Sequence, residues 1–346
     1  MWIYIFVFVI SMIFSEIAVL ENKRNKILFG GFSILSFMPV FLISAFRYNV
    51  GTDFKNYEVY FYYVKNGSQL EGIERGYWVL TKISSLISEN SSSFFFLSSL
   101  VVCGVVFLAI YQQSFNPPLS IFLFFGTTMY FVSFNGIRQI MASAVLIYSV
   151  KFIQKENIFK FFLFIIIATL FHSSAILFLP VYFVAKIKIN LKRTIMLILA
   201  VVVSIPIFDR ILIFASSILG YSQYFNSKFN TGEFEIWFFL INLGVLLLFS
   251  LFSNWRDINF QKYYWIQLIS FITTTLSSFI PLANRITWYF MFVQIISVPF
   301  VLKQIRNKKT KSIVTLCVCV AYFMVAYIGI GIQGSHNAVP YRWIFT

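Results

Sequence analysis

The feature that most constrains the fold is a series of apolar runs, most of them close to 20 residues long. About 20 apolar residues form a helix long enough to cross the hydrocarbon core of a bilayer. The chain has 346 residues, of which only 11% are charged, whereas a soluble domain carries about 25%. The pattern predicts an all-α polytopic membrane protein that forms a single integral membrane domain, 1–346. The twelve expected spans are about 2–20, 27–46, 93–111, 119–134, 137–153, 157–171, 173–187, 194–213, 236–253, 264–282, 286–302 and 312–331.

Alternate gaps between the runs are rich in Lys and Arg and hold only three acidic residues, Glu21, Glu156 and Asp257. Lys and Arg are retained on the cytoplasmic side of short loops, so both termini are expected outside. These loops also account for the net charge of +15. A nucleic-acid surface needs a basic face on a water-exposed domain, so we expect the lipid bilayer and no nucleic acid as a partner.

Residues 157–187 are apolar throughout but basic at both ends. A single span would place one basic cluster outside, which the charge rule disfavours. We therefore predict a tight hairpin that turns near His172 at the outer side. Pro180 is expected to kink the descending helix, with its lost hydrogen bond made up locally.

Two outer segments, about 47–92 and 214–235, are long enough to contact a substrate. The first ends in a stretch with apolar residues at helical spacing, which predicts an amphipathic helix in the outer interface. Those residues are Val79, Ile83, Leu86 and Ile87. The Tyr and Phe residues of the second segment suit either lipid headgroups or the faces of sugars.

The stretch F-R-Y-N-V-G-T-D-F-K-N-Y, residues 46–57, joins an apolar run to a polar loop. Arg47 ends the run and is either a snorkelling anchor or part of a site. Gly51 allows a tight turn, and Tyr57 offers a ring for stacking on a sugar. The carboxylate of Asp53 either forms a salt bridge with Arg47 or acts as a base.

Two more arginines, Arg138 and Arg285, begin apolar helices at the same outer level. Arg138 lies in F-N-G-I-R-Q, where Asn135 and Gln139 add donors to a helix N-terminus, which favours anions. Burying an unpaired guanidinium costs about 2.5 to 3.5 kcal/mol, and few carboxylates lie nearby. A phosphate-bearing ligand is the natural partner; the alternative is that Arg138 only anchors its helix.

His172 has a comparable pair of interpretations. A lone histidine in an apolar stretch is usually a hydrogen-bonded contact between helices, but at a hairpin apex it could also act as a base near its working pKa. The sequence contains no D-x-D, His-rich pair, P-loop, G-x-S-x-G or C-x-x-C pattern. We therefore predict neither a metal nor a cofactor.

Four motifs occur together: R-Y-N-V-G-T-D-F-x-x-Y (47–57), E-R-G-Y (74–77), F-N-G-I-R-Q (134–139) and H-S-S-A (172–175). In this combination the chain resembles the EpsG family, a branch of the Wzy-type polymerases of bacterial exopolysaccharide and capsule. The resemblance covers most of the chain, although the C-terminal half matches mainly in layout and in Arg285.

The resemblance implies a metal-independent membrane glycosyltransferase with GT-C-like architecture. Such enzymes join lipid-linked oligosaccharide repeat units at the outer face of the bacterial cytoplasmic membrane, with inversion at the anomeric carbon. The donor is a glycan on polyprenyl pyrophosphate, such as undecaprenyl pyrophosphate, and a flippase and a chain-length regulator are the expected partners. The implied catalytic residues are Arg47, Arg138 and Arg285 on the pyrophosphates, with Asp53 or His172 as the base. The implied substrate-binding residues are Gly51, Thr52, Tyr57, Glu74, Tyr77, Asn135 and Gln139.

Two other functions remain open from the sequence. One is a flippase or transporter of the same lipid-linked oligosaccharide, but transporters keep polar groups near the midplane and Glu16 is nearly alone in that position. The other is a membrane O-acyltransferase that modifies polysaccharide.

Overall fold

A computed structural model describes residues 1–68, 72–204, 236–252, 254–278 and 283–345. Within these ranges the chain is helical, and its one backbone bridge of the β type joins Arg47 to Trp343. The chain divides into two compact units. The first is Met1–Leu179 with Ile295–Thr346, and the second is Pro180–Gln294. The expected single integral membrane domain stays a prediction.

Five helices of the described ranges are long and apolar enough to cross a membrane. They are Trp2–Glu21, Lys26–Ala45, Ser92–Gln113, Arg285–Gln304 and Lys308–Ile332. Shorter apolar helices are Pro117–Gly126, Ile158–Phe171, Ser173–Val184 and Ile236–Leu251. The chain is therefore an all-helical membrane protein, while the total of twelve spans is not confirmed. The expected outer loop 214–235 and part of the span at 194–213 lie outside the described residues.

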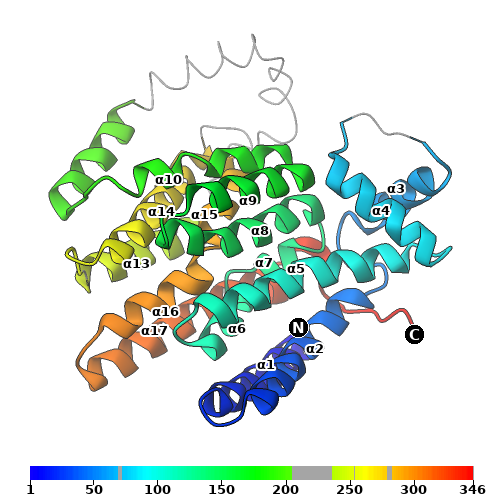
Figure 1. Cartoon of the computed structure of the whole chain (residues 1–346), viewed down its shortest axis with the longest axis horizontal. Coiled ribbons are helices and arrows are strands. Elements are labelled where there is room, and N and C mark those ends of the chain that lie inside the picture. Colours follow the sequence, from blue (N-terminus) through cyan, green and yellow to red (C-terminus); the bar gives the residue numbers. More distant parts are fainter. Residues whose placement is uncertain (69–71, 205–235, 253, 279–282, 346) are drawn as a thin grey trace. The chain divides into compact units, whose positions relative to one another are not determined.

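The first unit contains most of the long helices (Figure 1). They are α1 (Trp2–Glu21), α2 (Lys26–Ala45), α5 (Ser92–Gln113), α6 (Pro117–Gly126), α8 (Ile137–Gln154), α9 (Ile158–Phe171), α16 (Gln294–Gln304), which starts one residue before the unit, and α17 (Lys308–Ala326). A four-residue helix, α7 (Met129–Val132), lies between α6 and α8 in the chain. Four of these helices begin at an asparagine whose side chain accepts hydrogen bonds from the first-turn N–H groups. The capping residues are Asn25, Asn116, Asn157 and Asn307.

Helix α8 is buried along nearly its whole length. It packs against α5 on one side and α9 on another. By contrast, α1 and α2 pack side by side (Figure 1). They expose large apolar side chains such as Trp2 and Ile27, as helices in contact with lipid do. The first turn of α8, which holds Arg138, thus belongs to a helix that its neighbours hold on several sides.

The chain reverses near His172 as predicted, whereas the place of this turn at the outer side stays a prediction. Helix α9 ends at Phe171, and a 3-10 helix, Ser173–Phe178, packs back against it. The ring of Phe178 lies 6.4 Å from that of Phe161. The descending segment is interrupted at Pro180, after which α10 (Val181–Val184) forms a single turn, because proline cannot donate the hydrogen bond that would continue the helix.

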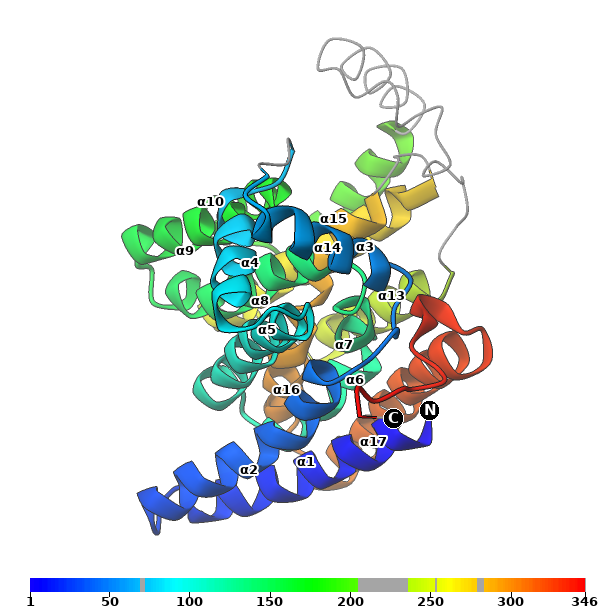
Figure 2. The ribbon, with the colours of Figure 1, turned by 90° about the vertical axis from the view of Figure 1, so that its right-hand side faces the viewer.

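Two helices of the first unit, α3 (Phe54–Lys65) and α4 (Arg75–Ile87), pack against each other (Figure 2). Helix α4 confirms the predicted amphipathic helix. It buries Tyr77, Thr81 and Ser84 and exposes the apolar residues Val79, Ile83, Leu86 and Ile87. A soluble protein would bury the apolar face, so the exposed one is what an interfacial helix presents to lipid.

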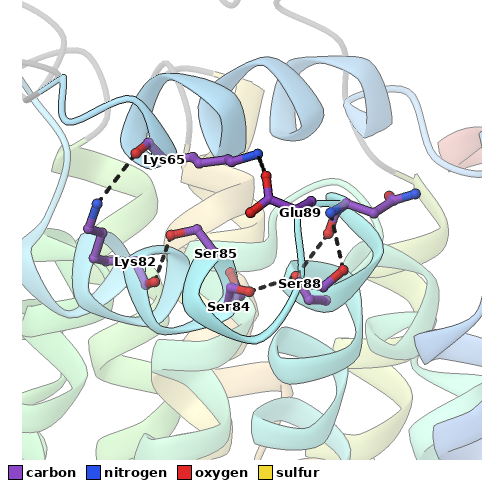
Figure 3. Close-up of polar contacts among 8 residues, drawn as sticks. Lys65, Lys82, Ser84, Ser85, Ser88 and Glu89 are labelled. Atoms are coloured by element: carbon purple, nitrogen blue, oxygen red, sulfur yellow. Dashed lines mark hydrogen bonds and ion pairs between the residues drawn. The ribbon is translucent and has the colours of Figure 1, made fainter.

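Polar contacts join the end of α3 to α4 and to the start of α5 (Figure 3). Lys65 forms an ion pair with Glu89, and Lys82 Nζ donates to the Lys65 carbonyl at 3.4 Å. Ser93 Oγ donates to the Ser84 carbonyl at 2.9 Å. An exposed ion pair contributes little to stability. These contacts therefore fix how the three helices lie against one another more than they stabilise the fold.

The second unit contains α10, α13 (Ile236–Leu251), α14 (Ile258–Thr275) and α15 (Ala283–Met291). A buried amide network centred on Asn242 joins α13 to α14 and to Gln294. The Asn242 side-chain oxygen accepts from Ser270 Oγ at 2.7 Å, Gln294 Nε2 at 2.9 Å and Gln267 Nε2 at 3.3 Å. The Asn242 amide nitrogen donates to Thr274 Oγ1 at 3.1 Å.

We expect Asn242→Leu to lower the free energy of unfolding by about 1 to 3 kcal/mol, because three buried donors lose an acceptor. Thermal unfolding in detergent measures the effect. Asn254→Leu is the control, because the side chain of Asn254 is exposed. Equal melting temperatures for the two variants would show that the network does not stabilise this unit.

Candidate active site

A carboxylate at the start of α4 joins three segments of the first unit. Arg138 Nη1 donates to Glu74 Oε2 at 2.7 Å, and His172 Nδ1 lies 2.8 Å from Glu74 Oε1. The Ser173 backbone N–H also donates to Oε1, at 3.2 Å. The side chains of Glu74, His172 and Arg138 are 13%, 22% and 32% exposed, so the cluster is partly shielded but still open to a ligand.

Local sequence explains why these residues meet. A Cβ at Gly76 would lie 2.7 Å from the Leu170 carbonyl oxygen, so only glycine lets α4 approach the end of α9. There His172 adopts an extended conformation that ends the helix. Gly136 precedes α8, and this places Arg138 in the first turn of that helix. The E-R-G-Y, F-N-G-I-R-Q and H-S-S-A motifs thus converge on one carboxylate.

The charges in the cluster determine which atoms of Glu74 and His172 carry a proton. Burial alone would raise the pKa of Glu74, but the hydrogen bond with His172 and the charge of Arg138 outweigh it and lower the pKa to about 2. An ionised carboxylate can only accept hydrogen bonds, so Nδ1 of His172 carries the proton. In the neutral ring, Nε2 is then free to accept a proton from another molecule.

The sequence led us to expect few carboxylates near Arg138 and a phosphate-bearing ligand as its partner, but in the structure Glu74 pairs with it. This pairing uses Nη1. The other N–H groups of the guanidinium make no hydrogen bond within the described ranges. Arg138 therefore keeps donors for a ligand while Glu74 fixes its position. The Tyr77 ring supports it from one side, with its centroid 5.8 Å from the guanidinium carbon.

Arg47 is 2% exposed and lies between the rings of Phe95 and Phe134. Its Nη1 donates to the Ser44 carbonyl at 2.5 Å and to Ser99 Oγ at 3.3 Å, whereas Nε has no hydrogen-bond partner among the described residues. The alternative of a salt bridge to Asp53 is wrong, since Arg47 pairs with no carboxylate of the described residues. The guanidinium is buried among helices rather than held at the interface as a snorkelling anchor.

Asn135 and Tyr57 hold the loop before α3 against α8. The Tyr57 hydroxyl donates to the Asn135 carbonyl and accepts from the Ile137 N–H at 3.1 Å. Gly51, at φ +106°, could not carry a Cβ, which would lie 2.8 Å from Asn135 Oδ1. Tyr57 is buried against Phe94, so its ring has no face open for stacking on a sugar, and Tyr57 and Asn135 act as positioning residues.

The remaining predicted residues lie in different environments. Gln139 is buried in α8, and Thr52 is exposed beside Gly51. Asp53, half-buried at the start of α3, makes no side-chain hydrogen bond or ion pair within the described part of the chain. Arg285 is exposed on α15 of the second unit, and its role stays a prediction.

With this geometry established, comparison with known proteins decides the family. A model described as the EpsG family matches residues 30–343. The chain belongs to the EpsG family. No curated protein and no solved structure matches it. The family resemblance of the four motifs is thereby confirmed, and EpsG family membership indicates a polymerase of polysaccharide biosynthesis.

Sequence reasoning gave little weight to the C-terminal segment of this EpsG family protein. The structure places His336 against Asn135, whose Nδ2 donates to the His336 carbonyl at 3.1 Å. Burial lowers the pKa of His336 to about 4, so the ring is neutral at pH 7. The only signal in the sequence is a polar stretch, G-S-H-N, directly after the last apolar run.

The side of the membrane on which the Glu74 cluster lies can be tested at the hairpin turn. Ser173→Cys places a thiol at an exposed position next to His172. In a background in which the three native cysteines are alanine, we expect a membrane-impermeant thiol reagent to label it in intact cells. Lys188→Cys, in a basic gap, should be labelled only after lysis. The reverse pattern would place the cluster on the cytoplasmic side.

Proposed function

We propose that this EpsG family protein joins lipid-linked oligosaccharide repeat units into exopolysaccharide or capsule at the outer face of the bacterial cytoplasmic membrane. The donor is a growing glycan on polyprenyl pyrophosphate, and the acceptor is one lipid-linked repeat unit. The observation that supports this function most directly is the His172–Glu74 pair beside the open guanidinium of Arg138. A base and a cation at one point suit glycosyl transfer from a phosphate leaving group.

His172 is the better-supported base of the two that the sequence left open. Its Nε2 accepts the proton of an acceptor hydroxyl as the oxygen attacks the anomeric carbon. Glu74 holds the tautomer and stabilises the imidazolium that forms, as the carboxylate does in a catalytic triad. Asp53 has no comparable partner and stays the second candidate.

Attack breaks the bond between the anomeric carbon and the pyrophosphate oxygen. Negative charge then grows on the leaving pyrophosphate, and the free N–H groups of Arg138 stabilise it. A preorganised cation in a partly shielded site is effective because it needs no reorganisation during the reaction. Arg47 and Arg285 remain proposed pyrophosphate ligands, and the attack from the opposite face gives inversion.

Metal independence is part of this proposal, and chelation tests it. The described residues contain no group of three or more His, Cys, Asp or Glu side chains arranged to hold a metal ion. An arginine keeps its charge without a metal. We expect EDTA to leave elongation unchanged. Loss of elongation in EDTA, restored by one divalent ion, would contradict this part of the proposal.

The function itself is tested with the purified protein in lipid vesicles and a synthetic lipid-linked repeat unit. We expect longer glycans on one lipid and one released polyprenyl pyrophosphate for each transfer. Movement of the repeat unit across the bilayer without elongation would identify a flippase instead. Transfer of acyl groups would identify an acyltransferase. In cells, deletion should leave single-repeat glycolipid without polymer, and an unchanged polymer length would contradict the proposal.

A further inference from the structure

A pocket of the first unit lies between the loop before α3 and the C-terminal segment. Its volume is about 410 Å³, within the range of pockets for small ligands. Its polar lining residues are Asn49, Thr52, Lys55, Asn337 and Arg342. We call it the tail pocket. The motif at residues 47–57 supplies one of its walls, including Gly51 and Thr52, but nothing in the sequence indicated that the C-terminal segment forms the other wall.

Backbone hydrogen bonds hold the two walls of the tail pocket together. The Tyr48 N–H donates to the Arg342 carbonyl at 2.9 Å, and the Gly51 N–H donates to the Asn337 carbonyl at 3.1 Å. On the far side of the Arg47–Trp343 bridge, the Ile344 N–H donates to the Phe46 carbonyl at 2.9 Å. These contacts make the tail pocket a built feature of the fold rather than a gap beside a loose terminus.

The tail pocket is rich in unused hydrogen-bond donors. None of its five polar side chains makes a hydrogen bond or ion pair with another described residue, and two of them, Lys55 and Arg342, are cations. No carboxylate of the described part of the chain lines the pocket. A site with two positive charges and several free donors is complementary to an anion with several acceptor oxygens. Phosphate and pyrophosphate have this chemistry, and the arginine fork can bind them at two points.

The tail pocket is separate from the Glu74 cluster, but Asn135 connects the two. Asn135 contacts the loop of the pocket, because the Asp53 N–H donates to Asn135 Oδ1 at 3.4 Å. Three residues later in the same motif, Arg138 contacts Glu74. The first unit therefore carries two distinct places that suit a phosphate group.

We propose that the tail pocket binds the phosphate groups of a membrane lipid. The assignment of that lipid rests on the proposed function: a polymerase handles two lipid-linked substrates, each with a pyrophosphate, and Arg138 serves one of them. The tail pocket then holds the pyrophosphate of the other. Anionic phospholipid headgroups share this chemistry, so the test separates the two sources.

The experiment measures binding of two probes, undecaprenyl pyrophosphate and phosphatidylglycerol, to the full chain in nanodiscs of neutral lipid. The test variant is Lys55→Gln/Arg342→Gln, and the control is Arg75→Gln, which removes an exposed outer cation that makes no described ion pair. We expect two undecaprenyl pyrophosphate molecules per wild-type chain and one per test variant. At the lost site the affinity should fall about tenfold or more, as for the loss of charged hydrogen bonds.

Each outcome has one meaning. Unchanged stoichiometry and affinity in the test variant would overturn the proposal. Loss of phosphatidylglycerol binding alone would support a lipid-phosphate site and overturn its assignment to a substrate. Arg342→Lys keeps the charge, so it should retain part of the affinity that the test variant loses. This result would exclude misfolding as the cause of the loss. Binding needs no polymerisation, so a failure of the proposed function would show as two-site binding without elongation.

Discussion

Arg138→Ala is expected to lower the rate of elongation by about two to four decades. Each charge-assisted hydrogen bond contributes about 1.5 to 3 kcal/mol, and those made to a leaving pyrophosphate strengthen in the transition state. The usual conversion of barrier to rate gives the size of the loss. The variant also leaves the carboxylate of Glu74 without its cation, which disturbs the orientation of His172.

Arg138→Lys separates the two interpretations of this residue. A lysine can pair with Glu74 and can snorkel as well as arginine, but it binds phosphate only as a point charge. We therefore expect partial recovery of the rate. Full-length polymer from Arg138→Lys would favour a helix anchor, and full-length polymer from Arg138→Ala would remove Arg138 from the site.

The measurement is polymer length in cells, normalised to the amount of protein in the membrane, together with the rate in vesicles. Arg75→Ala is the matched control. Arg75 is an exposed arginine next to Glu74 in the sequence, and it makes no ion pair within the described part of the chain. Its removal should leave polymer length unchanged.

His172→Ala is expected to lower the rate by about 10² to 10⁴-fold, the usual contribution of a general base. Glu74→Gln should cause a loss of similar order, because the glutamine amide can donate to Nδ1 and fix the wrong tautomer. The double variant should be no slower than His172→Ala alone, since residues that act as a unit are not additive. Thr169→Ala is the control, because its hydroxyl bonds only to its own helix, at the Ile166 carbonyl.

The pH dependence distinguishes a positioning role of Glu74 from a merely structural one. In Glu74→Gln the imidazolium loses its anionic partner, so the acid limb of the pH–rate profile should move to lower pH. A structural role would lower the rate equally at all pH values. If the losses in the double variant were additive, and if the pH–rate profile of Glu74→Gln did not move, the proposed His172–Glu74 pair would be contradicted.

The carboxyl of Glu74 does not itself titrate near neutral pH. The pKa of its carboxyl is about 2 in the folded protein against an ordinary 4.5, which is a depressed value. The pairing therefore stabilises the fold fully above about pH 4.5 and is lost as the pH falls toward 2. Loss of activity between pH 5 and 7 cannot arise from protonation of Glu74.

Much of the fold follows from local sequence. Apolar runs near 20 residues identify the membrane class, and the asparagines before α2, α6, α9 and α17 mark where those helices begin. The spacing of Val79, Ile83, Leu86 and Ile87 predicts α4 and its lipid-facing side. These features depend on residues within a few turns of one another, so the sequence by itself determines them.

Side-chain contacts between residues far apart in the sequence could not be predicted from local patterns. Glu74 lies 64 residues from Arg138 and 98 from His172, and the spacing of apolar residues carries no information on such pairs. The motifs predict all three at the outer level, but only the packing of α4 against α9, which Gly76 permits, brings the carboxylate of Glu74 between Arg138 and His172. Sequence reasoning therefore expected an external anion where the protein supplies Glu74.

The surroundings of Arg47 depend still more on tertiary structure. From the sequence alone it ends an apolar run, but in the fold it is buried between two aromatic rings and pairs its backbone with Trp343. The C-terminal segment that covers it also builds the tail pocket. Sequence determines which segments are apolar and helical because those are local properties, whereas burial and pairing depend on which distant segments pack together, and only the tertiary structure decides that.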